Sequence, residues 1–274
     1  MKPEDISLLV SLCRARAGLR VAPEKTYMIE SRLAPVARRE NYPSISDMLG
    51  AVRTQRDERL IWAVVEAMTA GESAFFQDRA SFKALRNDIL PRLAAARGSA
   101  PIRIWSAACG AGQEVYSLAM LADELAADYP AMRVELAASD LAERSLEKAQ
   151  SGLYSAFEVQ RGLPIRKLVD YFEKDGDSWR LAPRIRQMVR WRRINLVAGL
   201  AGLGSFDVVV CRHALCNMTP PAQKLVLEAL AEIAMPDGYL ILGVKETCEA
   251  TDAFLPVQDA PGVFARNPAF RAAA

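Results

Sequence analysis

The first third of the chain repeats apolar residues with the period of an α-helix. Apolar positions recur three or four residues apart in five stretches, which we expect to be helices: 8–19, 27–40, 44–53, 56–69 and 81–97. Gly18 is a natural helix stop for the first, and Ser44 or Ser46 is a candidate N-cap for the third. No strand-like run interrupts these stretches, so this part is predicted to be all-helical.

From residue 101 onward, apolar runs of strand length alternate with amphipathic stretches of helix length. The predicted strands are 102–108, 133–140, 188–196, 206–212 and 239–244, and the predicted helices are 113–129, 143–152 and 220–234. Such alternation is typical of right-handed βαβ units, whose parallel sheet is covered on both faces. Residues 154–192 break the pattern, and an Asp-Gly-Asp turn there predicts a small antiparallel hairpin beside the sheet.

Composition narrows the class of protein. Of the 274 residues, 51% are hydrophobic and 25% are charged, which is typical of a folded globular protein. Lys and Arg number 35 against 33 Asp and Glu, so the charge does not favour nucleic acid as a partner. No apolar run reaches the roughly 20 residues that cross a bilayer, and no signal-peptide pattern opens the chain. We expect a soluble, cytoplasmic protein with no membrane insertion.

Cysteine and histidine are too few and too scattered for a metal site. No CxxC pair occurs among the five cysteines, which are Cys13, Cys109, Cys211, Cys216 and Cys248. A disulfide framework or a zinc site is therefore not expected. His213 is the only histidine, which excludes a histidine-rich metal site.

The strongest local signal follows the first predicted strand. Residues 102–120 read IRIWSAACGAGQEVYSLAM, so a turn with Gly110 and Gly112 leads into a helix beginning near Gln113. Glycine lets a ligand approach the backbone, and a helix N-terminus offers free N–H groups. The second strand ends in Asp140, which is well placed to accept hydrogen bonds from a ribose. This arrangement serves nicotinamide cofactors and S-adenosylmethionine alike; the alternative is a tight turn with Asp140 capping the next helix.

A series of motifs, in order along almost the whole chain, resembles the chemotaxis receptor methyltransferase (CheR) family. WSAACGAGQEVYSLAM is close to the family's WSAACSTGEEPYSLAM. The other motifs are GLRVAPEKTYMIESRL (18–33), MTAGESAFFQD (68–78), LEKAQSGLY (146–154), YF (171–172), INL (194–196), FDVVVCRH (206–213) and MPDGYLILG (235–243).

The resemblance implies an α/β fold with a Rossmann-like sheet of the S-adenosylmethionine-dependent methyltransferase type. A helical N-terminal domain is expected at 1–70, a linker and connecting helix at 71–95, and the methyltransferase domain at 96–274, with its small antiparallel insertion at about 154–192. Phe75 and Phe76 are expected to anchor the linker in the core.

The activity implied by the resemblance is transfer of a methyl group from S-adenosylmethionine to glutamate side chains of chemoreceptors, with S-adenosylhomocysteine as product. A glutamate carboxylate, with a pKa of about 4.3, is already ionised at neutral pH and needs no general base. The work of such an enzyme is alignment and desolvation, and no metal is needed.

The resemblance also implies which side chains form the site. The expected cofactor-binding residues are Gly71, Ser73, Gln77, Ala108, Gly110, Glu114, Asp140, Leu141, Asn195, Leu196, Arg212 and His213. Glu114 and Asp140 are expected to be the main polar contacts, and Asn195 and Leu196 to flank the adenine. His213 is expected to pack against the cofactor, with a catalytic role as the alternative.

Departures from the family pattern cluster at this site. The family's linker Asn is Gly71 here and its Arg is Gln77, while CRNVLIYF reads CRHALCNM at 211–218. Gln77 and Asn217 thus stand at the expected catalytic positions, in place of Arg and Tyr. Because Gln cannot supply a cation to hold a carboxylate, a catalytically impaired, cofactor-binding regulatory protein is the alternative. A small-molecule or nucleic-acid methyltransferase is disfavoured by the N-terminal domain and the weak charge.

Two groups of basic residues are candidate partner surfaces. Arg32, Arg38 and Arg39 correspond to the basic surface that faces the acidic receptor bundle in the family, so receptor contact is expected there. The second group is interpreted as a solvated strand face, with a docking surface as the alternative: Arg180, Arg184, Arg186, Arg190, Arg192 and Arg193. The hairpin around DGDSW is short, so a tether through a receptor's C-terminal pentapeptide is not expected.

Overall fold

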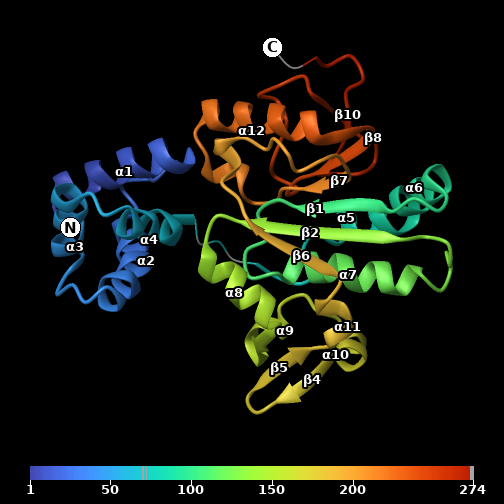
Figure 1. Ribbon diagram of the computed structural model, residues 1–274, viewed down its shortest axis with the longest axis horizontal. Coiled ribbons are helices and arrows are strands. Elements are labelled where there is room, and N and C mark those ends of the chain that lie inside the picture. The colour runs from blue at the N-terminus through green and yellow to red at the C-terminus, as the bar shows by residue number, and fades with distance from the viewer. Residues whose placement is uncertain (70, 72, 272–274) are drawn as a thin grey trace.

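The computed structural model describes residues 1–69, 71 and 73–271. Figure 1 shows a group of helices at the N-terminal end, a twisted sheet with helices on both faces, and a smaller insertion beside that sheet. The motif at 68–78 and the helical domain expected over 1–70 include positions outside the described residues. None of the described helices has the length and apolar character needed to cross a membrane.

Four helices make up the N-terminal part, as the periodicity predicted: α1 (Pro3–Ala17), α2 (Thr26–Arg39), α3 (Ile45–Gln55) and α4 (Glu58–Thr69). Their apolar stripes pack together around Leu9, Ile29 and Leu33, whose side chains are fully buried. Ser44 is the N-cap of α3, since its hydroxyl accepts a hydrogen bond from Asp47 N at 3.1 Å. Gly18 ends α1 at a φ of +65°, a left-handed conformation that favours glycine.

The connecting helix predicted over 81–97 is interrupted. It consists of α5 (Arg79–Ala84), a π-helical turn at Leu85–Ile89 and α6 (Leu90–Arg97). Pro91 lies in the first turn of α6, has no N–H to donate, and would clash with the carbonyl group four residues earlier in a regular α-helix. The wider π turn before it relieves this conflict.

The main sheet has seven strands in the order β6-β2-β1-β7-β8-β10-β9. Five are parallel, as predicted: β6 (Val189–Arg193), β2 (Val134–Asp140), β1 (Ile102–Ser106), β7 (Phe206–Val210) and β8 (Ala234–Ile241). β9 (Phe254–Pro256) and β10 (Val263–Arg266) are antiparallel additions that the sequence analysis missed. The chain leaves β1 for β2 on one side and later reaches β7 on the other, which makes the carboxyl end of β1 the place for a ligand.

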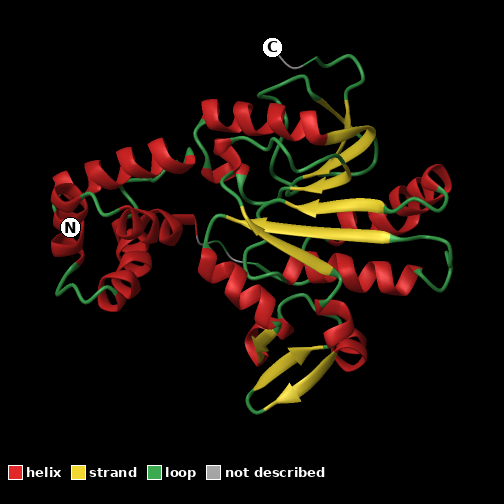
Figure 2. Ribbon diagram, viewed as in Figure 1, coloured by secondary structure: helices red, strands yellow, loops and turns green. Residues whose placement is uncertain are grey.

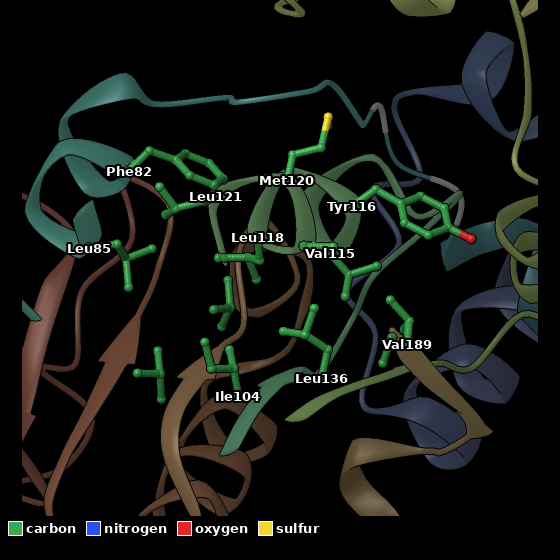
Figure 3. Close-up of a cluster of buried hydrophobic side chains, with 14 of the residues drawn as sticks. Phe82, Leu85, Ile104, Val115, Tyr116, Leu118, Met120, Leu121, Leu136 and Val189 are labelled. Atoms are coloured by element: carbon green, nitrogen blue, oxygen red, sulfur yellow. The ribbon is translucent and has the colours of Figure 1, made fainter. Parts of the chain in front are cut away.

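Helices cover both faces of this sheet (Figure 2). α7 (Gln113–Leu125), α8 (Glu143–Ser151) and the connecting helix lie on one face, and α12 (Pro220–Ile233) lies on the other with the short turns η2 (Leu196–Ala198) and η3 (Leu215–Asn217). Figure 3 shows Val115 and Leu118 of α7 above Ile104 and Leu136 of the strands. Because side chains alternate along a strand, the neighbouring Trp105 packs in the cluster under α12.

The insertion is larger than the predicted hairpin. β4 (Phe172–Asp175) and β5 (Ser178–Leu181) form that hairpin, but β3 (Leu153–Ser155) pairs with the other edge of β5. Three short helices complete it: α9 (Ala156–Gln160), α10 (Ile165–Tyr171) and α11 (Pro183–Arg186). Segments this short carry too little periodicity to be read from sequence.

Most of the second basic group is not a solvated strand face, which corrects that interpretation. Arg180 pairs with Asp175 across the hairpin, Arg184 Nη1 lies 2.7 Å from Asp123 Oδ2, and Arg186 donates to the Ser151 carbonyl. Arg190 and Arg192 are exposed on β6, an edge strand of the main sheet, where they agree with the prediction. Exposed charge on an edge strand disfavours pairing with other chains.

We predict that Gly18→Ala destabilises the protein more than Gly176→Ala does. Both glycines have φ near +60°, so each alanine carries a left-handed backbone penalty of about 1 kcal/mol. A Cβ at Gly18 would lie 2.5 Å from Ala222 Cβ, whereas at Gly176 it would meet nothing within 4 Å. The overpacking at Gly18 adds roughly 1–3 kcal/mol, measurable by urea denaturation. Equal losses in the two variants would contradict this close approach of α1 to α12.

Candidate functional site

A single pocket gathers the residues that the sequence analysis proposed for the site. It holds about 920 Å³ of empty space, its open mouth included, which is in the range of small-molecule sites. Every predicted site residue lines it: Gly71, Ser73, Gln77, Ala108, Gly110, Glu114, Asp140, Leu141, Asn195, Leu196, Arg212, His213 and Asn217. They come from the linker and from the carboxyl ends of β1, β2, β6 and β7. Their placement is thus established, while their individual roles stay predictions.

Asp140 closes the pocket at the end of β2. Its Oδ2 accepts a hydrogen bond from Gly110 N at 2.9 Å, and its Oδ1 accepts one from Ala142 N at 2.9 Å. Burial raises the pKa of Asp140, and these two N–H donors oppose that shift. Asp140 therefore does cap the following segment, as the bland alternative held. A carboxylate offers about four lone-pair sites, so capping still leaves acceptors for a ligand.

Arg212, just after β7, is the centre of a buried charge cluster. Its Nη1 donates to Glu114 Oε2 at 2.8 Å and to the Gln77 carbonyl at 2.9 Å, and its Nη2 pairs with Asp78. The Arg212 side chain is only 2% exposed. Burial raises the pKa of Glu114, and the positive charge of Arg212 opposes that shift. The cluster joins β7, the first turn of α7 and the linker into one wall.

Phe75 and Phe76 anchor the linker, as predicted. Phe75 is fully buried, with its ring centroid 5.1 Å from that of Tyr154 and 5.6 Å from that of Phe172, both in edge-to-face geometry. Phe76 N donates to Ser117 Oγ at 2.9 Å. The linker is thus fixed to the insertion on one side and to α7 on the other, which sets the position of Gln77.

Glu246 is a buried organising residue that the sequence analysis missed. Its Oε2 accepts hydrogen bonds from His213 N at 2.7 Å and Gly243 N at 2.8 Å, and its Oε1 accepts one from Cys216 N at 3.0 Å. These bonds hold His213 at a φ of +59°, a conformation uncommon for any residue with a Cβ. A single acid in an irregular segment gives no periodic or motif signal from which this role could be inferred.

The N-terminal helices supply a wall that was also missed. Ala17, Leu19 and Thr69 line the pocket, and Leu19 forms an isolated antiparallel bridge with Met218, another lining residue. Thr219 N donates to the Gly18 carbonyl at 2.8 Å. Small apolar side chains beside a helix end carry no chemical signature, so only the folded arrangement places them here.

Polar contacts hold this wall against the sheet. Asn195 Nδ2 donates to the Arg16 carbonyl at 2.7 Å. Arg193 pairs with Glu66 of α4 and donates to the Leu141 carbonyl at 3.0 Å, so it too departs from the expected solvated face. Burial raises the pKa of Glu66, and the charge of Arg193 opposes that shift. Two pocket residues, Leu141 and Asn195, are thereby tied directly to the helical part.

The first basic group is unevenly exposed. Arg38 is exposed on α2, whereas Arg32 and Arg39 are half-buried. Arg32 Nη1 donates to the Met68 carbonyl at 2.8 Å, and burial lowers its pKa. Arg39 Nε lies 2.9 Å from Glu40 Oε1. Their role in receptor contact stays a prediction.

Comparisons with known proteins identify relatives along the whole chain. Residues 4–69 match the profile of the CheR methyltransferase all-alpha domain, and residues 71–262 match that of the CheR methyltransferase SAM-binding domain. Chemotaxis protein methyltransferase 1 of Pseudomonas aeruginosa is 34% identical over 96% of this chain and 97% of that protein. A chemotaxis protein methyltransferase of Vibrio anguillarum is 35% identical over 91% of each.

Likeness to solved structures is looser. A glycopeptide N-methyltransferase complexed with S-adenosylmethionine matches with a TM-score of 0.35 and 14% identity, over 64% of this chain and 57% of that one. No argument below depends on it.

We predict that Glu246→Gln loosens the segment that carries His213. A Gln side chain keeps one acceptor oxygen, but its NH2 group would face a backbone N–H that Glu246 now satisfies. Leaving that buried N–H unpaired costs about 1–3 kcal/mol of unfolding free energy, measured in urea. The matched control is Glu249→Gln, an exposed change in the same segment. Equal stability of the two variants would contradict the role given to Glu246.

Proposed function

Because the chain belongs to the CheR methyltransferase family, we propose that it transfers the methyl group of S-adenosylmethionine to glutamate side chains in the cytoplasmic domains of chemoreceptors. The observation that carries the proposal is the pocket itself. Residues that the family resemblance assigns to the cofactor come from separate segments of the chain and line this one space. A cytoplasmic location follows from such a substrate and is part of the same proposal.

The polar groups of the pocket suit S-adenosylmethionine. Asp140 would accept hydrogen bonds from the ribose hydroxyls, and Leu141 and Leu196 would flank the adenine. The buried Nε of Arg212 has no hydrogen-bond partner in the described part of the chain, which leaves one donor for the cofactor's carboxylate. Glu114 and Asp140, with the adjoining Asp78, make the surroundings acidic, which favours a ligand that carries a sulfonium charge.

The chemistry places modest demands on the protein. S-adenosylmethionine supplies a methyl group that an ionised carboxylate can accept directly. The residues around the pocket therefore need to bind, orient and exclude water, and no proton has to be moved. The Arg212 cluster, the linker anchored by Phe75 and the segment held by Glu246 give a rigid frame for that task.

Contact with the receptor is proposed through the N-terminal helices. Arg38 is exposed on α2, and positive charge at this surface would favour an acidic partner. The short β4–β5 hairpin supports the expectation that no C-terminal pentapeptide tether is used. These partner assignments rest on the family and on charge.

We predict that the protein binds S-adenosylhomocysteine in the micromolar range, about −8 kcal/mol by calorimetry, and that Asp140→Asn weakens this binding. An Asn amide offers one acceptor oxygen instead of two, so we expect a loss of about ten- to a hundredfold, as for other hydrogen bonds to charged groups. Asp128→Asn, an exposed change in the turn after α7, is the matched control. Wild-type affinity in Asp140→Asn would remove Asp140 from the cofactor site.

Methyl transfer itself is tested with a chemoreceptor cytoplasmic fragment from the source organism and S-adenosylmethionine carrying a labelled methyl group. A glutamate methyl ester releases its label as methanol in base, whereas N-methyl products do not. We expect base-labile label on the wild-type fragment and none when its acceptor glutamates are replaced by Gln. Tight binding of S-adenosylhomocysteine without transfer would instead support the regulatory alternative.

A further inference from the structure

An acceptor carboxylate that enters the pocket needs a donor. Among the described lining residues, two have basic side chains, Arg212 and His213. The terminal nitrogens of Arg212 already donate to Glu114, the Gln77 carbonyl and Asp78, and the whole side chain is 2% exposed. An incoming protein side chain therefore cannot reach Arg212.

His213 is the accessible one of the two. Its side chain is 42% exposed, and its Nε2 lies 3.9 Å from Asp78 Oδ2, next to the linker position of Gln77. Glu246 fixes its backbone N–H. Gly243 makes room for its ring, because a Cβ there would lie 2.9 Å from the Cε1 and 3.0 Å from the Nδ1 of the imidazole. The ring is thus held from behind, at the edge of the pocket.

We propose that the imidazole of His213 holds the carboxylate of the acceptor glutamate. The inference rests on the proposed function and names the residue that receives its substrate. Imidazole has an N–H donor in both of its protonation states, so it can bind a carboxylate oxygen in either. Asp78, Glu114 and Glu246 surround this corner, and a carboxylate arriving among them without a donor would meet repulsion alone.

The arrangement is compatible with the transfer step. One carboxylate oxygen is held by His213, and the other forms a bond to the methyl carbon while the bond from that carbon to sulfur breaks. The electron pair of the broken bond stays on sulfur, and no proton is taken up or released. His213 therefore acts as a donor that positions the nucleophile.

The single histidine makes a direct binding test possible. Its imidazole gives one NMR signal, which can be followed in protein saturated with S-adenosylhomocysteine. The probe is N-acetylglutamate α-amide, whose only carboxylate is the γ-carboxylate, and its uncharged match is N-acetylglutamine α-amide. We expect a saturable shift with the glutamate compound alone. A signal that does not move, or that moves equally with both compounds, would overturn the proposal.

Kinetics with a chemoreceptor cytoplasmic fragment give a second test. Asn tolerates a left-handed backbone, so His213→Asn removes the imidazole with little strain. We expect the KM for the fragment to rise about tenfold, the loss of one hydrogen bond to a charged group, with affinity for S-adenosylhomocysteine unchanged. Adding Gln77→Arg to this variant should lower the KM again, since it restores a cation to the same corner. Lys245→Gln, an exposed charge change in the Gly243–Glu246 segment, is the control.

The outcomes separate this inference from the proposed function. An unchanged KM in His213→Asn would overturn the inference while the function stands. Weakened S-adenosylhomocysteine binding with an unchanged KM would show that His213 holds the cofactor's own carboxylate, which also overturns it. If the wild-type protein yields no base-labile label, the proposed function fails, and the NMR titration still decides what His213 binds.

Discussion

The buried guanidinium of Arg212 is the interaction on which the rest of the site depends. It joins the end of β7 to Glu114 at the start of α7 and to both the backbone and the side chain of the linker. Removing one partner of such a buried charge cluster costs about 3–5 kcal/mol, because the remaining charges are left uncompensated. Asp140 and Gly110 sit on the same frame, and Gln77 and His213 adjoin it. The pocket therefore keeps its shape only while this cluster is intact.

Sequence reasoning was strongest where one chemical signal coincides with regular structure. The periods of helix and strand gave the four N-terminal helices and the five parallel strands, and Gly18 and Ser44 marked two helix ends. The residues proposed for the site lie together because parallel strands bring their carboxyl ends to one edge of a sheet. Their local motifs were visible, but which atoms they contact was not, since that depends on segments distant in the chain.

What escaped prediction is tertiary in origin. β9 and β10 are three and four residues long, and each exists because a neighbouring strand is there to pair with it. Glu246 is one acid in a turn, and its three N–H partners lie on two segments. The insertion arginines looked solvated in sequence, yet Arg180 and Arg184 find carboxylates that only the fold brings near. Burial and pairing are properties of the assembled structure, so periodicity cannot report them.

The substitutions at positions 77 and 217 remove side chains but no step of the proposed reaction. A carboxylate that attacks directly requires alignment and a place to rest, and neither depends on a proton relay. The frame that provides alignment is present: Phe75 anchors the linker, Arg212 binds its backbone, and Glu246 fixes His213. A protein that had given up catalysis would have no need for an exposed donor beside an acid-lined pocket, held in a strained conformation by a buried carboxylate. The combination of a neutral Gln77 with His213 across the same corner instead argues that the acceptor-binding group has moved from one wall of the pocket to the other.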